Sequence, residues 1–251
     1  MENIEAKLNV PGPVEQSLQG LVESLKEGAG DNLQSVIIYG SIARGHFRPG
    51  ASDVNLVILL KDVSASELDK IDQPLRKARN SINANAMIMT GDEVARSADV
   101  FPVKFMHIKN YHLVLFGDDP FADLNISPQH LRIRLEQELR NISIRLRNRY
   151  INLHQDKTVS TSLVSNLIGS FAVQMRTLLE LTGNPIPQEH STKAHLIAAA
   201  DAFDLDKEAL EAASELRRGV SPVMEVQDIF ARVMKSVDKA VQVADQLELK
   251  E

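Results

Sequence analysis

The stretch Val36–Leu60, VIIYGSIARGHFRPGASDVNLVILL, decides how the first half of the chain folds. It opens with an apolar run that ends at Gly40–Ser41, and it closes with a second apolar run that begins at Asp53. A glycine at a strand end lets the backbone turn sharply, which leaves Ser41 and nearby N–H groups facing an anion. Because side chains alternate along a strand, positions 53 and 55 share a face and could hold one ion. This geometry suits a triphosphate.

Short apolar runs broken by turn residues surround this stretch, and they predict strands alternating with helices. The helices are expected over Val14–Lys26 and Ser64–Ser81, the second with a Ser64–Glu67 capping box and a kink or restart at Pro74. The expected strands are Ser35–Tyr39, Asp53–Leu60, Asn85–Met89 and Lys104–Ile108, the last with a continuation over Leu113–Phe116. The first half is therefore predicted to be an α/β (α+β) domain with a small mixed sheet.

From Ser127 onward the strand signals stop and long helical patterns follow one another, which predicts an all-α helical bundle. Ser127–Pro128 and Ser221–Pro222 each combine a capping residue with a proline, a pattern typical of a helix start. The expected helices are Ser127–His154, Thr158–Leu181, Thr192–Phe203, Asp206–Arg217 and Val223–Leu247. With the acidic connector Gly117–Asp123 between the halves, the predicted domains are residues 1–121 and 122–251.

The first predicted bundle helix carries six arginines within an acidic chain, Arg132, Arg134, Arg140, Arg145, Arg147 and Arg149. The Glu136–Arg140 spacing favours an exposed helix face with ion pairs. The alternative is a positive wall that faces phosphate or nucleic acid.

Composition excludes several classes of protein. The 251 residues contain no cysteine, so disulfides, thiolate metal sites and cysteine nucleophiles are excluded. A net charge of -6 and 4% aromatic residues argue against a general nucleic-acid binder. The N-terminus lacks a signal-peptide pattern and no apolar stretch is long enough to span a bilayer, so we expect a folded cytoplasmic protein without a membrane partner.

The pattern of an apolar strand, Gly-Ser, a short gap and then Asp-x-Asp or Asp-x-Glu resembles the signature of the DNA-polymerase-β-like nucleotidyltransferase superfamily. Gly40, Ser41 and Asp53 match it, and Arg44–Gly45 extends the match to the G-S-x-A-R-G form. The run Asp99–Phe121, DVFPVKFMHIKNYHLVLFGDDPF, is similar to bacterial members with a helical C-terminal domain, the aminoglycoside nucleotidyltransferase-like proteins. The resemblance implies binding of a nucleoside triphosphate through Gly40, Ser41 and Arg44.

Two positions depart from the three carboxylates that the family's Mg²⁺ chemistry requires. The second position is Asn55, whose single neutral carbonyl oxygen is a poor ligand for Mg²⁺. The resemblance places Lys104 on a neighbouring strand at the third position, where a cation would repel the metal. Lys104 would either bind a phosphate or pair with Asp53, and both readings stay open. Asp53 is then the remaining catalytic carboxylate and a weak metal ligand.

Three functions follow from this reading. The first is a nucleotide-binding protein with a degenerate metal site and weak or lost transfer activity. The second is an active Mg²⁺-dependent nucleotidyltransferase that moves a nucleoside monophosphate to a hydroxyl of a small molecule, nucleic acid or protein, with Asp53 and Asp62 or Asp99 supporting one metal. The third is an interaction module that acts through the helical bundle. The acceptor, any protein partner and the oligomeric state are not defined by the sequence.

Overall fold

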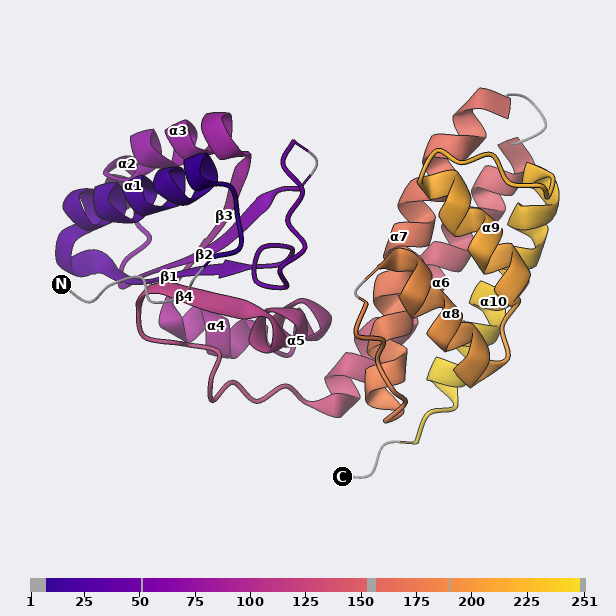
Figure 1. Cartoon of the computed structure of the whole chain (residues 1–251). Coiled ribbons are helices and arrows are strands. Elements are labelled where there is room, and N and C mark those ends of the chain that lie inside the picture. The colour runs from indigo at the N-terminus through magenta and orange to yellow at the C-terminus, as the bar shows by residue number, and fades with distance from the viewer. Residues whose placement is uncertain (1–7, 51, 153–156, 190, 249–251) are drawn as a thin grey trace. The chain divides into compact units, whose positions relative to one another are not determined.

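The computed structural model divides the chain into two compact units, residues 1–126 and 127–251 (Figure 1). It describes residues 8–50, 52–152, 157–189 and 191–248, with only the backbone at 152 and 157–166. The boundary between residues 126 and 127 lies just after the acidic connector Gly117–Asp123, so the connector belongs to the first unit.

A four-stranded mixed sheet forms the centre of the first unit, as predicted. Its spatial order is β3-β2-β1-β4, and only β2 and β3 run parallel. The central strands read as near-continuous apolar runs because both of their faces are covered. Val36, Ile37 and Ile38 of β1, for example, are fully buried. The strands are β1 (Leu33–Tyr39), β2 (Val54–Leu60), β3 (Ala84–Met89) and β4 (His112–Gly117).

Helices cover both faces of this sheet (Figure 1). On one face, Val36 and Ile38 pack in the same cluster as apolar residues of α1 (Gly12–Ala29) and α3 (Asp72–Ile82). On the other face, Ile37 packs in a cluster with residues of α4 (Gly91–Ser97) and α5 (Pro102–Asn110). A 3-10 turn, η1 (Gly30–Asn32), joins α1 to β1. Alternate side chains of β1 thus point to opposite faces of the sheet and pack in two separate apolar cores.

The segment predicted as one helix over Ser64–Ser81 forms two helices, α2 (Ala65–Asp69) and α3. The predicted capping box is wrong, because the Ser64 side chain makes no cap bond and its hydroxyl donates instead to Asp62. The break precedes Pro74 and centres on Ile71, which is fully buried. Gly28 of α1 lies against this break, since a Cβ there would be 2.7 Å from the Lys70 carbonyl oxygen.

The strand predicted over Lys104–Ile108 is wrong, because Pro102–Asn110 forms helix α5. Pro102 occupies the start of the helix, where its missing N–H costs nothing, and Phe105 and Ile108 share the buried face three residues apart. The predicted continuation is β4 itself. Helix α4, absent from the prediction, begins with a Thr90–Glu93 capping box that the sequence T-G-D-E contains.

Among the described residues of the second unit, five helices surround an apolar core, which confirms the predicted bundle. The predicted cap at Ser221–Pro222 is wrong, because the last helix begins at Val226, after a segment that bends at residues 223–224. Among the described residues, no helix combines the length and the apolar character needed to cross a bilayer. The helices are α6 (Pro128–Asn152), α7 (Lys157–Leu181), α8 (Thr192–Phe203), α9 (Lys207–Arg217) and α10 (Val226–Asp245).

Four of the six arginines of α6 make ion pairs within the described chain, as the Glu136–Arg140 spacing predicts; they are Arg132, Arg134, Arg140 and Arg147. Arg140 Nε lies 2.7 Å from Glu136 Oε1, and Arg134 Nη2 lies 2.6 Å from Glu138 Oε1. Arg147 reaches across to α10, where its Nη2 lies 3.0 Å from Asp238 Oδ1.

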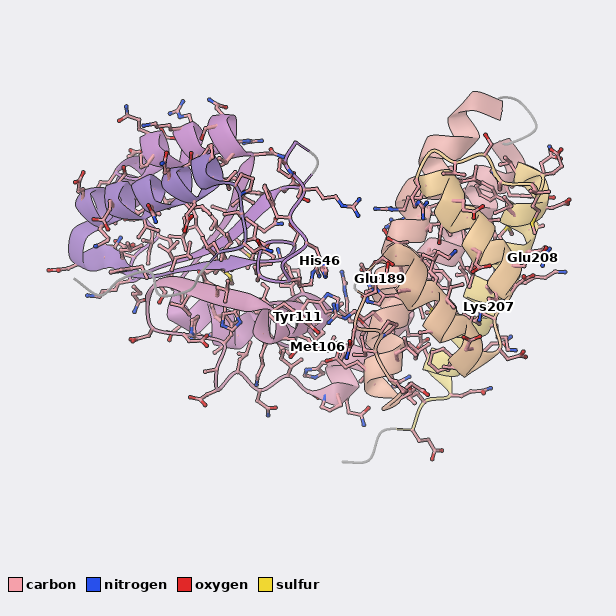
Figure 2. All side chains as sticks on the ribbon, viewed as in Figure 1. His46, Met106, Tyr111, Glu189, Lys207 and Glu208 are labelled. Carbon is pink, nitrogen blue, oxygen red and sulfur yellow. The ribbon has the colours of Figure 1, made fainter. Side chains whose placement is uncertain are left out.

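An arginine fork joins α9 to α10 in the second unit. Arg232 Nε and Nη2 donate to the two carboxylate oxygens of Asp206 over 2.7 and 2.8 Å. Asp206 also caps α9 by accepting a bond from the Ala209 N–H over 3.1 Å. The hydrogen bond from Arg232 lowers the pKa of the Asp206 carboxyl, against the opposing effect of burial. Glu208, labelled with Lys207 in Figure 2, adds a second acidic partner for Arg232.

Removing the Asp206 carboxylate should destabilise the second unit. Asp206→Ala loses both the cap and the fork, so we expect a loss of about 1 kcal/mol or more in the free energy of unfolding, measured by urea titration. Asp201→Ala, which removes only an exposed pair with Lys207, is the control and should cost much less. Equal losses would contradict this role of Asp206.

The same carboxylate predicts a pH dependence. Because the folded pKa of Asp206 is lowered, its contribution is present above the unfolded pKa of about 3.9 and is lost as pH falls through the lower folded value. Asp206→Asn keeps a capping side chain but cannot ionise. Its stability deficit relative to the parent should therefore be present at pH 7 and shrink below about pH 4. A deficit independent of pH would contradict the charged fork.

Candidate functional site

The turn after β1 begins at Gly40, whose φ of 83° favours glycine. It is closed by backbone bonds from the Arg44 N–H to the Gly40 oxygen over 3.1 Å and from the His46 N–H to the Ser41 oxygen over 2.8 Å. A Cβ at position 40 would lie 3.3 Å from Asn55 Nδ2. The sharp turn therefore brings the Gly-Ser segment directly against the second predicted metal position.

The first N–H groups of this turn are available to a ligand. Within the described chain, the backbone N–H groups of Ser41, Ile42 and Ala43 have no hydrogen-bond acceptor. Ser41 and Arg44 are partly buried, whereas Ile42 is buried and anchors the turn in the core below α1. Successive free N–H groups of this kind favour an anion.

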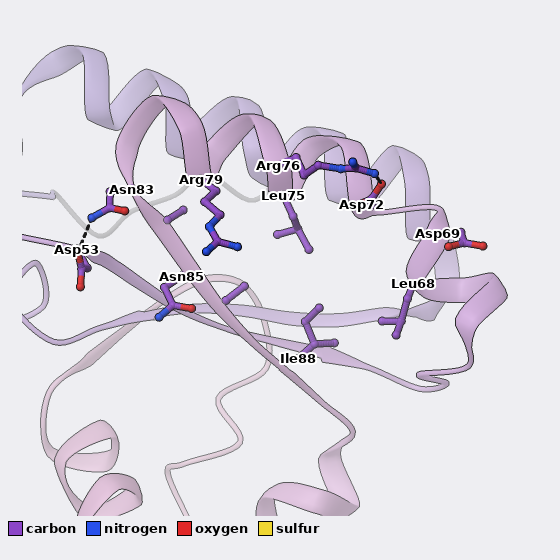
Figure 3. A pocket seen from close by; sticks show the side chains of 12 residues that line it. Asp53, Leu68, Asp69, Asp72, Leu75, Arg76, Arg79, Asn83, Asn85 and Ile88 are labelled. Carbon is purple, nitrogen blue, oxygen red and sulfur yellow. Dashed lines mark hydrogen bonds and ion pairs between the residues drawn. The ribbon is translucent and has the colours of Figure 1, made fainter.

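Asp53 lies just before β2 and is held from the neighbouring strand. The side-chain amide of Asn83 donates to the Asp53 carboxylate (Figure 3). Asn83 ends α3 in the left-handed region with a φ of 52° and leads directly into β3. Its backbone oxygen accepts the Val54 N–H over 3.2 Å, which fixes the start of the parallel pairing. The exposed carboxylate therefore has one neutral donor as its partner.

The residue opposite Asn55 on the parallel strand is Asn85. Directly paired residues on adjacent strands share a face and lie about 4.8 Å apart. The predicted placement of Lys104 on a neighbouring strand is wrong, since Lys104 is an exposed residue of helix α5. A role for Lys104 in binding phosphate stays a prediction. Asn85 was missed, although it begins the strand that the sequence predicts over Asn85–Met89.

These residues form a donor set of one carboxylate and three amides, Asp53, Asn55, Asn83 and Asn85. Mg²⁺ prefers carboxylate and water oxygens, so this set fits the ion poorly. Among the described residues, no three acidic, histidine or cysteine side chains group together as metal ligands would. Tyr39 flanks Asn55 on the other side, and burial raises the pKa of its phenol, so it stays neutral at pH 7.

The two other carboxylates considered from the sequence lie elsewhere. Asp62 follows the far end of β2, whereas Asp53 precedes its start, so the strand separates them. Its carboxylate accepts bonds from Ser64 at the start of α2. Asp99 lies in the turn between α4 and α5. Neither residue takes part in the cluster around Asn55 and Asn85.

A glycine exchange should test how closely the turn approaches Asn55. Gly40→Ala and Gly45→Ala both place a side chain at positive φ, at 83° and 72°, which costs about 1 kcal/mol each. Only at Gly40 does the added Cβ meet Asn55, since Gly45 has open space around it. Urea unfolding should therefore show a larger loss for Gly40→Ala. Equal losses would contradict the close contact.

Comparison with known proteins agrees with this geometry. Residues 18–87 match the family model described as a nucleotidyltransferase domain. The fold is similar to that of spectinomycin adenyltransferase from Enterococcus faecialis, crystallised with ATP and spectinomycin, at a TM-score of 0.56 and 12% identity. That match covers 89% of this chain and 99% of the other. No curated protein matches the chain in sequence. The family model over residues 18–87 and the similar fold together support placing the first unit in the DNA-polymerase-β-like nucleotidyltransferase superfamily.

Proposed function

We propose that this chain binds a nucleoside triphosphate at a degenerate nucleotidyltransferase site, with weak or lost transfer activity. The observation that carries the proposal is the pairing of Asn55 with Asn85 on adjacent parallel strands. Both positions next to Asp53 that could complete a metal site carry neutral amides. A divalent cation would therefore bind with much less favourable electrostatic energy than among three carboxylates.

The turn after Gly40 supports binding of the phosphates. The turn that carries the Ser41, Ile42 and Ala43 N–H groups begins at Gly40, which lies against Asn55. These N–H groups would contact the anion at the place where the family's triphosphate is expected. Asn55 and Asn85 add amide donors that carboxylates cannot supply. Amides in place of carboxylates also remove negative charge that would repel a triphosphate without its metal. The site thus favours the nucleotide more than the metal.

A second candidate is a working transferase. It is favoured by the similarity of the whole fold to an adenyltransferase that was crystallised with ATP and an acceptor, spectinomycin. Asp53 would then be the one carboxylate available at the site. Transfer of labelled AMP from ATP to a panel of small-molecule, nucleic-acid and protein acceptors tests this candidate. A product that disappears with Asp53→Asn would establish it.

Binding of ATP should depend little on Mg²⁺. We expect calorimetry to give similar dissociation constants with Mg²⁺ and with EDTA, within about threefold, because the donor set offers the metal little. Asp53→Asn should tighten binding in EDTA, since it removes a carboxylate beside the triphosphate. Asp62→Asn, at the other end of β2, is the matched control and should leave binding unchanged. Absence of binding in both conditions would refute the proposal, as would binding that requires Mg²⁺.

Restoring carboxylates should restore the metal. Asn55→Asp combined with Asn85→Glu gives Asp53 two acidic neighbours on one face, so ATP binding should become at least tenfold tighter with Mg²⁺ than with EDTA. The control is Asn55→Gln with Asn85→Gln, which changes size without charge.

The stability of that double variant gives a second readout. Three carboxylates repel one another without a metal, so its unfolding temperature should fall in EDTA and recover with Mg²⁺. A folded double variant that gains no response to Mg²⁺ would show that Asn85 does not occupy the third carboxylate position.

A further inference from the structure

Strand β3 has an open hydrogen-bonding edge. It lies at the end of the sheet and pairs only with β2 among the described strands. Because the Asn83 oxygen accepts from Val54 of β2, alternate residues from Asn83 onward face β2. The backbone groups of the residues between them, Ala84, Ala86 and Ile88, therefore point outward.

The sequence of β3 does nothing to block this edge. Proteins usually protect an edge strand with lysine, proline or a bulge, because unpaired N–H and C=O groups recruit another strand. The strand reads ANAMIM, without charge or proline, and its pairing with β2 is regular over Val54–Leu59. The edge is therefore competent to pair with a further strand.

A groove runs along this edge below α2 and α3 (Figure 3). Its volume is about 510 Å³. Leu68, Leu75 and Ile88 line it with partly exposed apolar side chains, and the small side chains of Ala84 and Ala86 leave it open beside the strand. Apolar surface of this kind gains free energy when a partner covers it.

The groove carries Arg79 and the Asp53 carboxylate at the end where β3 starts, and the acid Asp69 at its other end. Arg79 stands over the start of β3 near Asn85, and Asp69 lies at the other end beyond Leu75 (Figure 3). Neither Arg79 nor Asp69 makes an ion pair or a side-chain hydrogen bond within the described chain. Arg76 and Asp72, between them, already pair with each other. An occupant must therefore present an acid to Arg79 and a base to Asp69.

We propose that a second copy of this chain occupies the groove, with the two β3 strands pairing antiparallel about a two-fold axis at Ala86. In that register Ala84 faces Ile88 of the second copy, and the two Ala86 residues exchange both backbone bonds. The antiparallel direction brings Arg79 of each copy to Asp69 of the other, and Leu75 to Leu75. The surface is thus complementary to itself, as a two-fold interface requires. The product is one continuous sheet of eight strands.

A charge exchange tests this arrangement in the full-length chain. Light scattering over a concentration series should show a dimer for the parent. Arg79→Glu and Asp69→Arg should each raise the dimer dissociation constant at least tenfold. Each change puts two like charges opposite each other, and the two-fold axis repeats that repulsion at a second place in the interface. The double variant that carries both changes should recover the parent's value, since it restores opposite charges in reversed order. Lys77→Glu, on α3 but outside the groove, is the matched control and should change nothing.

A backbone change separates strand pairing from charge. Ala86→Pro removes an outward N–H that has no partner in the single chain, so it should leave the monomer folded by circular dichroism and abolish the dimer. A parent that stays monomeric at all concentrations would overturn the proposal. So would a dimer unaffected by Ala86→Pro, or single charge variants that the double variant does not rescue. Each of these results would assign the groove to another occupant.

Discussion

The pairing of Asn55 with Asn85 on two adjacent parallel strands is the constraint on which the site depends. The register places their side chains on one face, and the Asn83–Val54 backbone bond fixes that register at the strand start. Because Gly40 has no Cβ, the turn that begins there lies directly against Asn55. In the proposed function, the turn after Gly40 binds phosphate, and the neutral side chains at positions 55 and 85 disfavour a metal.

The chemistry of the cluster follows from the charges. A single carboxylate that accepts a bond from a neutral amide leaves little negative potential for Mg²⁺, whereas amide and backbone N–H groups favour phosphate oxygens. The second unit has a separate apolar core, and ion pairs such as the Asp206–Arg232 fork join its helices. The fold similarity to the spectinomycin adenyltransferase covers 89% of the chain, so it extends into this second unit.

Much of this could be predicted from the sequence, and the errors have physical causes. Strands β1 and β2 and the long bundle helices carry strong apolar periods bounded by glycine or proline, so their existence was clear. The strand predicted around Lys104 was wrong because a short apolar run of valine, phenylalanine and isoleucine can form either a strand or a buried helix. Pro102 at its start was the signal for a helix. Because of that error, Lys104 and not Asn85 was expected beside Asn55. The strand that pairs with β2 is set by tertiary contacts, which sequence spacing does not specify. The capping box at Ser64 failed because Asp62, two residues away, bonds to the same hydroxyl.

Asp53, Asn55 and Asn85 together should not hold a divalent cation. Titration of the protein with Mn²⁺, followed by electron paramagnetic resonance of the free ion, measures this directly and without a nucleotide. The signal of free Mn²⁺ should stay near that of buffer up to protein concentrations of about 0.1 mM, because one carboxylate and neutral amides bind a hard cation weakly. Loss of that signal with a micromolar dissociation constant, restored by Asp53→Asn, would contradict it.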